Sequence, residues 1–211
     1  PEMLEYLISN NHTEISEGAR IIDVKEESDK KEMPPVILVK SDGGVLYDST
    51  ELATLYSRVR RFDADAYFYL TDIRQELHFV QAFRAAYKTN LVEKNIDLEW
   101  FGFGTMNGPD GKPFKTRDGG VMSLRELISM VSTETRKIIK DNIKEEEKDE
   151  LAEKLAIASI KYADLLPHRT SDYLFDPIKF SDINGKTGPY LLYSTVRMNS
   201  LLKKANIDKE F

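Results

Sequence analysis

Ala66-Tyr-Phe-Tyr-Leu70, Glu76–Thr89 and Leu98-Glu-Trp-Phe-Gly-Phe103 are the segments that decide the fold class of this 211-residue chain. The first and the third are short apolar runs between polar turn residues, which is typical of buried strands. The middle segment is predicted to be an amphipathic helix, because apolar residues recur in it at helical spacing: Leu77, Val80, Phe83 and Tyr87. A strand, a helix and a second strand in this order predict a right-handed crossover between parallel strands.

The chain before residue 66 extends this α/β pattern. We expect a short helix over residues 1–10 and a strand over Ala19–Val24. The run Val36–Val39, the turn residues Ser41-Asp-Gly-Gly44 and the run Val45–Tyr47 indicate a hairpin. A helix capped by Thr50 should follow, with an apolar face made of Leu52, Leu55, Val59 and Phe62. Alternating strands and helices from residue 36 to residue 103 therefore predict one parallel sheet.

The pattern changes after residue 107. A long polar, glycine-rich loop runs to Gly120, and a helix is expected to begin at Ser123 with Leu124, Leu127, Ile128 and Val131 on one face. The charged run 140–154 links or opens a second long helix that continues to Leu165, and a third should cover Pro189–Lys204. We expect no strand here apart from Val121-Met122, so the sequence predicts an α/β domain over residues 1–122 and an all-helical segment over residues 123–211.

Composition narrows the possible classes of protein. There is no cysteine, which excludes disulfides and cysteine-based zinc sites, and a reducing compartment is expected. No apolar run approaches the ~20 residues needed to span a bilayer, and no signal peptide opens the sequence. The net charge of −6 means that any contact with nucleic acid must come from local basic surface. Both ends lie in or near expected helices, so we expect a piece of a longer protein.

Ligands of open parallel sheets bind beyond the carboxyl ends of the strands. The segment Tyr47–Glu51 is the first candidate, because Tyr47 is expected to end a strand and Glu51 to lie in the first turn of the next helix. A carboxylate beside a phenol can hold a cationic ligand through charge-assisted hydrogen bonds. Equally, Glu51 is a residue that the helix dipole favours near a helix N-terminus. The residues alone favour this second, structural interpretation.

The second candidate is Asp72–His78, which joins a strand to a helix and places Gln75 near the helix start. Its structural interpretation, which the residues alone favour, makes Asp72 a helix cap and His78 an interior polar residue bonded to backbone. The third candidate is the loop with the cations Lys112, Lys115 and Arg117 between glycines. Such a loop can fold over phosphates and stabilise charge in a transition state, or it can be a solvated basic loop.

This third segment resembles a known family. Lys112-Pro-Phe-Lys-Thr116 looks like a variant of the Lys-Met-Ser-Lys-Ser signature of class I aminoacyl-tRNA synthetases. The five-residue motif alone is weakly specific, but the wider run Gly104-Thr-Met-Asn-Gly-Pro-Asp-Gly-Lys-Pro-Phe-Lys-Thr-Arg-Asp-Gly-Gly120 is similar to arginyl-tRNA synthetases of bacteria in particular.

Nearly all of the chain takes part in this resemblance. Lys40-Ser-Asp-Gly43, Asp72-x-x-Gln75-x-x-His78 and Ile160–Leu165 resemble motifs of the family, as does Gly188–Arg197. Three departures stand out. Glu51 takes the place of the usual Asp, and Ser194 takes that of a common His. The ATP-binding His-x-Gly-His signature of the first half of the nucleotide fold does not occur, because the only histidines are His12, His78 and His168.

The resemblance implies the second half of a class I synthetase nucleotide-binding (Rossmann-like) fold, followed by the first helices of the anticodon-binding domain. It implies an arginine–tRNA ligase that uses ATP with Mg²⁺, arginine and tRNA(Arg), in the cytoplasm and as a monomer, with no protein-bound metal. On its own, the chain is expected to be incomplete and inactive. The implied sites are Tyr47, Glu51 and Gln75 for arginine; Phe103, Gly104, Met106 and His78 for ATP; Lys112 and Lys115 for catalysis; and Tyr193 and Arg197 for tRNA.

Two alternatives to this interpretation remain open. One is a non-catalytic RNA-binding or interaction module derived from a synthetase, against which the intact lysine loop argues. The other is a class I enzyme for a different amino acid, against which the cation-binding set Tyr47, Glu51 and Gln75 argues. In the last helix, Tyr190 and Tyr193 lie on one face with Arg197, and tyrosines at such positions more often pack in the interior than bind RNA.

Overall fold

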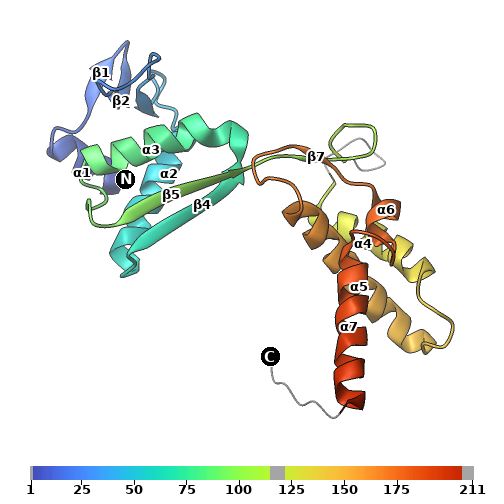
Figure 1. Cartoon of the computed structure of the whole chain (residues 1–211). Helices are drawn as coiled ribbons and strands as arrows, with labels where there is room; N and C mark the ends of the chain where they lie inside the picture. The colour runs from blue at the N-terminus through green and yellow to red at the C-terminus, as the bar shows by residue number, and fades with distance from the viewer. Residues whose placement is uncertain (1, 115–121, 206–211) are drawn as a thin grey trace. The chain divides into compact units, whose positions relative to one another are not determined.

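The computed structural model describes residues 2–114 and 122–205. The chain forms two compact units, Pro1–Phe103 and Gly104–Phe211. We call them the first and the second unit and describe each by itself (Figure 1). The contacts divide the chain at Gly104, whereas the sequence placed the domain boundary between residues 122 and 123. The difference arises because the segment after the last strand of the first unit packs with the helices that follow it.

The first unit combines two small sheets with three α-helices. A three-stranded antiparallel sheet in the order β1-β2-β3 is formed by Glu14–Ser16, Ala19–Ile22 and Val36–Val39. A parallel pair is formed by β4 (Ala66–Asp72) and β5 (Asp97–Phe103). The helices are α1 (Glu2–Ser9), α2 (Tyr47–Arg61) and α3 (Glu76–Lys88), and the short 3-10 helix η1 (Ile73–Gln75) precedes α3.

The predicted crossover is confirmed, and the predicted single sheet is wrong. β4 and β5 pair in parallel from Ala66 and Asp97 to Asp72 and Phe103, with α3 between them in the chain. β3, however, pairs with β2 in an antiparallel sheet instead of joining β4. Alternation of strands and helices predicts parallel strands, but it does not state which strands are neighbours.

The predicted hairpin has only one full arm. After β3, the turn closes through the Lys40 amide to the Gly44 carbonyl (2.8 Å), and a single bridge joins Val39 to Val45. Tyr47 therefore begins α2 instead of ending a strand, and Leu46, not Thr50, is the N-cap. The Ser49 hydroxyl donates to the Leu38 carbonyl (2.5 Å), which fixes the first turn of α2 against β3.

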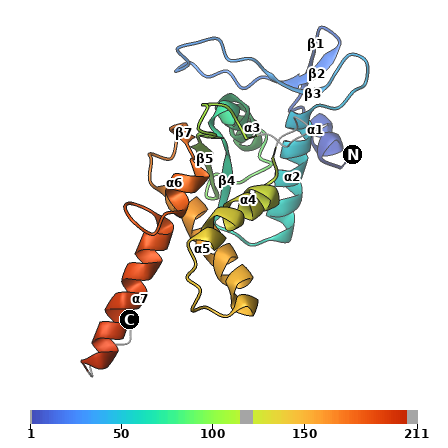
Figure 2. The ribbon, with the colours of Figure 1, turned by 90° about the vertical axis from the view of Figure 1, so that its right-hand side faces the viewer.

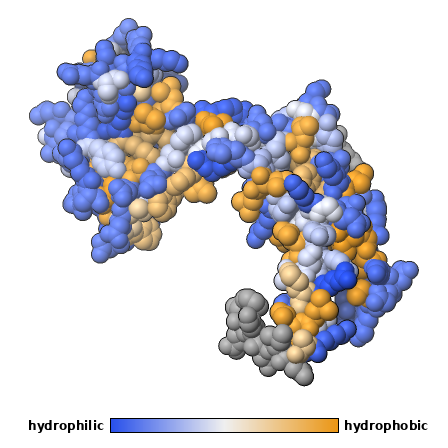
Figure 3. Space-filling model, viewed as in Figure 1, coloured by the Kyte–Doolittle hydropathy of each residue, from blue (hydrophilic) through white to orange (hydrophobic). Residues whose placement is uncertain are grey.

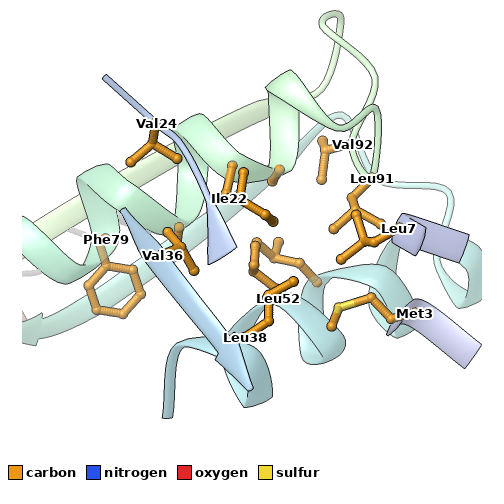
Figure 4. Close-up of a cluster of buried hydrophobic side chains, with 14 of the residues drawn as sticks. Met3, Leu7, Ile22, Val24, Val36, Leu38, Leu52, Phe79, Leu91 and Val92 are labelled. Atoms are coloured by element: carbon orange, nitrogen blue, oxygen red, sulfur yellow. The ribbon is translucent and has the colours of Figure 1, made fainter. Parts of the chain in front are cut away.

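The core of the first unit lies between the antiparallel sheet and the helices (Figure 4). Leu7 of α1, Leu38 of β3, Leu52 of α2 and Phe79 of α3 are all fully buried. On α3 the buried residues differ from the predicted face: they are Phe79, Gln81 and the small residues Ala82, Ala85 and Ala86, whereas Leu77 is half exposed. Alanines let the helix approach its neighbours closely. A prediction that looks only for large apolar residues misses a buried helix face made of alanines.

β4 was predicted to be buried, and this is correct for one face only. Tyr69 is buried against Phe79 and Phe83 of α3. On the opposite face Phe68 is 60% exposed and Leu70 is 69% exposed. Both faces of a parallel sheet are usually covered, so the outer face of β4 and β5 is an uncovered apolar surface. Apolar surface over β4 is visible in Figure 3.

The second unit is mainly helical, with one small parallel pair of strands. Its helices are α4 (Leu124–Lys137), α5 (Glu145–Leu165), α6 (Pro177–Ser181) and α7 (Gly188–Lys204). β6 (Met106–Asn107) pairs in parallel with β7 (Tyr173–Leu174). The expectation of no strand after the glycine-rich loop is therefore wrong. β7 has two residues, which is too short for a periodic pattern to show.

The core of this unit lies where α4, α5 and the segment after β7 meet, and it contains Leu127, Val131, Ala156, Ile160 and Phe175. At the start of α7, a Cβ on Gly188 would lie 2.1 Å from the Ala158 carbonyl oxygen of α5, so only glycine permits this helix contact. Beyond that contact α7 extends away from the other helices of its unit (Figure 2), and most of its side chains are exposed.

The predicted start of α4 at Ser123 is confirmed. Ser123 and Glu126 form a capping box in which each side chain accepts a hydrogen bond from the other residue's backbone amide (3.3 and 2.8 Å). These bonds satisfy two amides that a helix N-terminus leaves without partners. They also hold the pKa of the Glu126 carboxyl below its usual range, because both the backbone amide and the hydroxyl of Ser123 stabilise the charged form.

We expect Ser123→Ala to lower the free energy of unfolding by about 1 kcal/mol, since the alanine cannot accept the amide hydrogen bond. Urea unfolding followed by circular dichroism measures the change. Ser123→Thr keeps a hydroxyl and is the matched control, with an expected loss of less than about 0.5 kcal/mol. Equal losses in the two variants would contradict the assignment of the cap.

Candidate functional site

In the first unit, a cluster of polar side chains joins the start of α2 to the start of α3. The Nδ1 atom of His78 lies 2.5 Å from Oδ1 of Asp48, and the ring of Tyr47 lies 4.8 Å from the ring of His78. The His78 side chain is 15% exposed, while Tyr47 is 61% exposed. The structural interpretation of His78 as bonded to backbone is therefore wrong: it bonds to a carboxylate from another helix.

The His78 ring has one nitrogen without a partner. Nε2 is buried and has no hydrogen-bond partner among the described atoms, although buried polar atoms usually have one. Asp48 accepts from Nδ1–H in the neutral ring, so it fixes the tautomer in which Nε2 is an acceptor. The pair thus holds the imidazole in one orientation beneath the exposed Tyr47 ring.

Glu51 belongs to a second cluster, in which the phenol of Tyr69 is the central group. Arg58 of α2 donates to the Tyr69 hydroxyl (3.3 Å). Burial and the neighbouring Glu51 carboxylate raise the pKa of Tyr69 to about 12, against the opposing effect of Arg58. Glu51 is half-buried and lies in the second turn of α2, not in the first as the sequence predicted. Its carboxylate is therefore held near a phenol and a guanidinium of the same chain.

The part of the structural interpretation that made Asp72 a helix cap is confirmed. Asp72 caps η1 by accepting from the Arg74 amide (2.9 Å), and it accepts two further bonds from the Arg74 guanidinium. These bonds from Arg74 lower the pKa of Asp72 to about 2. Gln75 is the N-cap residue of α3, but its side chain makes no capping bond and is exposed.

The residues that the resemblance assigns to ATP continue from β5. Phe103 is the last residue of β5 and is 44% exposed, and Gly104 and Met106 follow in the second unit. A Cβ on Gly104 would lie 2.3 Å from the Ser171 carbonyl oxygen, so this position requires glycine. The Gly104 amide donates to the Arg169 carbonyl (2.9 Å), and this bond holds the backbone at Gly104 against the chain that precedes β7.

The loop with the candidate catalytic lysines begins as a tight turn. The Gly108 amide donates to the Lys112 carbonyl (2.7 Å), and Gly111 has a φ of 76°, which favours glycine. Asp110 accepts from the Lys112 amide (3.1 Å), and the Lys112 residue is exposed. Lys115 and Arg117 lie outside the described residues.

The candidate tRNA-facing residues lie on α7. Tyr190 and Tyr193 are 44% and 48% exposed, and Arg197 is exposed. Interior packing therefore does not account for the two tyrosines in the described part of the chain. Apolar side chains are exposed along the same helix: Leu191, Leu192, Val196, Met198 and Leu201. Figure 3 shows apolar surface in this part of the second unit.

The described residues contain no group of three or more His, Asp or Glu side chains that could hold a metal ion. Within residues 2–114 and 122–205, no helix is both long and apolar enough to cross a membrane. Sequence reasoning missed two pairings in these clusters: Asp48 with His78, and Tyr69 with Glu51 and Arg58. In both, the partners come from different elements of the fold, so no local spacing predicts the pairing.

A parallel strand–helix–strand unit that leads into a glycine-rich lysine loop defines an α/β protein of the nucleotide-binding type. The family described as tRNA synthetases class I (R), catalytic domain, matches residues 1–177, and the chain belongs to this family.

Curated relatives agree with this membership. The chain is 46% identical over 204 residues to an arginine–tRNA ligase of Alkaliphilus oremlandii, with 96% of this chain and 35% of that protein covered. It is 46% identical over 212 residues to the one of Agathobacter rectalis, with 97% and 36% covered. The chain thus spans about a third of the length of these relatives.

Solved structures show the same fold. The arginyl-tRNA synthetase of Plasmodium falciparum superimposes with a TM-score of 0.78 at 30% identity. The superposition covers 98% of this chain and 34% of the Plasmodium protein. The enzyme of Thermus thermophilus superimposes with a TM-score of 0.73 at 18% identity, over 100% of this chain and 40% of its own. The fold predicted from the lysine loop and its flanking motifs is confirmed.

We expect the stability of the chain to fall as the pH rises from about 10 to about 12 because of Tyr69. A tyrosine in the unfolded chain loses its proton near pH 10, while the folded state keeps the proton to about pH 12. Below pH 10 both states are protonated, so the full contribution is present there. Above pH 10 the unfolded state binds fewer protons than the folded state, so the free energy of unfolding falls by roughly 2 kcal/mol by pH 12.

Urea unfolding between pH 8 and pH 11 tests this expectation. The Tyr69→Phe variant lacks the titrating group, so its stability should fall less steeply above pH 10 than that of the unmodified chain. Glu51→Gln removes the neighbouring negative charge and should give an intermediate slope. Identical slopes in all three proteins would contradict the interpretation.

Proposed function

We propose that this chain is part of an arginine–tRNA ligase, and that the complete protein activates arginine with ATP and transfers it to tRNA(Arg). The observation that carries the proposal is identity of 46% over nearly the whole chain to proteins named arginine–tRNA ligase. In this proposal the chain supplies the second half of the catalytic domain and the first helices of the tRNA-binding domain. ATP arrives with Mg²⁺, and the protein works in the cytoplasm as a monomer.

The amino-acid pocket is assigned to Tyr47, Glu51 and Gln75. A guanidinium is a planar fork of donors, which a carboxylate can accept in a bidentate way. The exposed Tyr47 ring and the exposed Gln75 side chain leave both available to a ligand. In the described structure Glu51 faces the Tyr69 phenol, so that contact orients the carboxylate before arginine binds.

ATP is assigned to the segment that follows β5. In this proposal the backbone at Phe103, Gly104 and Met106 contacts the adenine, and His78 is assigned to the same nucleotide. Lys112 and Lys115 stabilise the phosphates as the bond to pyrophosphate breaks, which is the role of loop cations in phosphate chemistry. Tyr193 and Arg197, exposed on α7, face tRNA.

The uncovered face of β4 and β5 fits a catalytic domain that needs more chain than these 211 residues. Phe68 and Leu70 are exposed there, and no described helix covers them. In this proposal the rest of the complete protein covers this face and carries the ATP-binding signature that this sequence lacks.

We expect the 211-residue chain to catalyse no arginine-dependent exchange of pyrophosphate into ATP, with or without tRNA. A complete protein that contains this sequence should catalyse the exchange, and lysine should not replace arginine. Exchange of labelled pyrophosphate measures both. Turnover by the chain alone clearly above background would contradict the prediction that it is inactive by itself. No turnover by the complete protein would overturn the proposed function.

In the complete protein, we expect Glu51→Gln to weaken arginine binding by roughly 3–5 kcal/mol, since a buried guanidinium loses its counter-charge. Tyr47→Phe removes one neutral hydrogen bond and should cost about 1 kcal/mol. Equilibrium binding of arginine measures both changes.

Asp48→Asn is the matched control, because it removes a carboxylate from the same helix face that instead pairs with His78. We expect a smaller loss of arginine affinity in this variant than in Glu51→Gln. The reverse order would assign the counter-charge to Asp48 and remove Glu51 from the pocket.

A further inference from the structure

The segment from Gly104 to Asn107 is bonded to the chain around β7 at every residue. Gly104 donates to the Arg169 carbonyl, Tyr173 donates to the Thr105 carbonyl (3.0 Å), and β6 pairs with β7 in parallel. The Phe175 amide then donates to the Asn107 carbonyl (2.8 Å). Two segments that are about 67 residues apart in the sequence therefore form one structural element.

Asp172 joins the two segments of this element through its side chain. A single oxygen, Oδ1, accepts from both the amide and the hydroxyl of Thr105, at 2.7 and 2.6 Å. Hydrogen bonds to an ionised carboxylate are shorter and stronger than neutral ones. Asp172 thus fixes the backbone and the side chain of the residue immediately before β6.

The base of the lysine loop is built directly on β6. A bridge joins Asn107 to Pro113, and the Gly108 amide bonds to the Lys112 carbonyl. Phe114 packs against the fully buried Phe175, with ring centroids 6.1 Å apart. The position of Lys112 therefore follows the position of β6, which in turn is held by the chain around β7.

We propose that Asp172 is a positioning residue for the start of the lysine loop: by holding Thr105, it sets where Lys112 is presented. The proposal deepens the proposed function, and its catalytic consequence rests on that function. The residue touches no reacting atom in this role. It acts through Thr105 and β6, and a displacement of about 1 Å in a catalytic group can reduce a rate strongly.

The first test uses the 211-residue chain and does not depend on activity. Trypsin cleaves after Lys115 and Arg117, whereas Pro113 protects the bond after Lys112. We expect Asp172→Ala to raise the cleavage rate after residues 115 and 117 about tenfold, since charge-assisted hydrogen bonds of roughly 1.5–3 kcal/mol are lost. Mass spectrometry of the peptides gives the rate at each site.

Three further variants separate positioning from folding. Asp172→Asn keeps one side-chain oxygen acceptor and should stay within about twofold of the unmodified rate. Thr105→Val loses only the hydroxyl bond and should lie between Asp172→Asn and Asp172→Ala. Tyr173→Phe, the matched control on the neighbouring residue, loses the bond to Asp164 (2.8 Å) but keeps the contacts with Thr105, and should cleave at the unmodified rate.

The proposal is overturned if Asp172→Ala leaves cleavage after residues 115 and 117 unchanged. It is also overturned if cleavage rises equally at all sites in residues 122–205, because Asp172 then merely supports folding. Circular dichroism of each variant shows whether the helices are retained.

The second test is steady-state activation of arginine by the complete protein. Asp172→Ala should lower kcat about tenfold and leave the KM for arginine within about twofold, while Asp172→Asn restores kcat, because a misplaced loop affects the transition state and not arginine binding. A raised KM with normal kcat would overturn the catalytic consequence. If the complete protein lacks the activity altogether, the proposed function fails, while the protease result still decides whether Asp172 positions the loop.

Discussion

The parallel pairing of β4 with β5 is the constraint on which the first unit depends. Parallel neighbours require a crossover, and α3 provides it and covers one face of the pair with Phe79 and a row of alanines. The same geometry brings the carboxyl ends of both strands to one edge, where Asp72 and Phe103 are in register. Two of the segments that carry candidate ligand-binding residues begin at this edge: Asp72–His78 and the segment that starts at Phe103. The geometry also leaves Phe68 and Leu70 uncovered on the other face.

The carboxylates near the candidate arginine pocket all have partners within the chain. Asp48 pairs with His78, Asp72 with Arg74, and Glu51 lies beside Tyr69. An unpaired buried charge is costly, so these internal partners stabilise the carboxylates. These contacts also fix rotamers, which lowers the entropy lost when a ligand binds. The raised pKa of Tyr69 reflects the same closeness of a phenol and a carboxylate in a buried setting.

The described part of the lysine loop, up to Phe114, groups with the helical segment, although the sequence placed it with the strands before it. β6 and β7 tie the loop to the segment between α5 and α6, and Phe114 packs on the core of that unit. The sequence predicted the last long strand correctly, up to Phe103. It then kept the following loop in the same domain and placed the boundary after residue 122. Hydrogen bonds across 67 residues decide the grouping, and they leave no periodic trace in the sequence.

The sequence by itself determined the helices and the strands of the βαβ unit, the cap at Ser123 and the family, because these rest on local periodicity, local hydrogen bonds or contiguous motifs. It did not determine that β3 leaves the parallel sheet, that Tyr47 opens a helix, or that a two-residue strand at Tyr173 pairs with β6. Residue types near the site were predictable, but their pairings were not. Which groups meet depends on how distant segments pack, and only the tertiary structure brought Asp48 to His78, Glu51 to Tyr69 and Asp172 to Thr105.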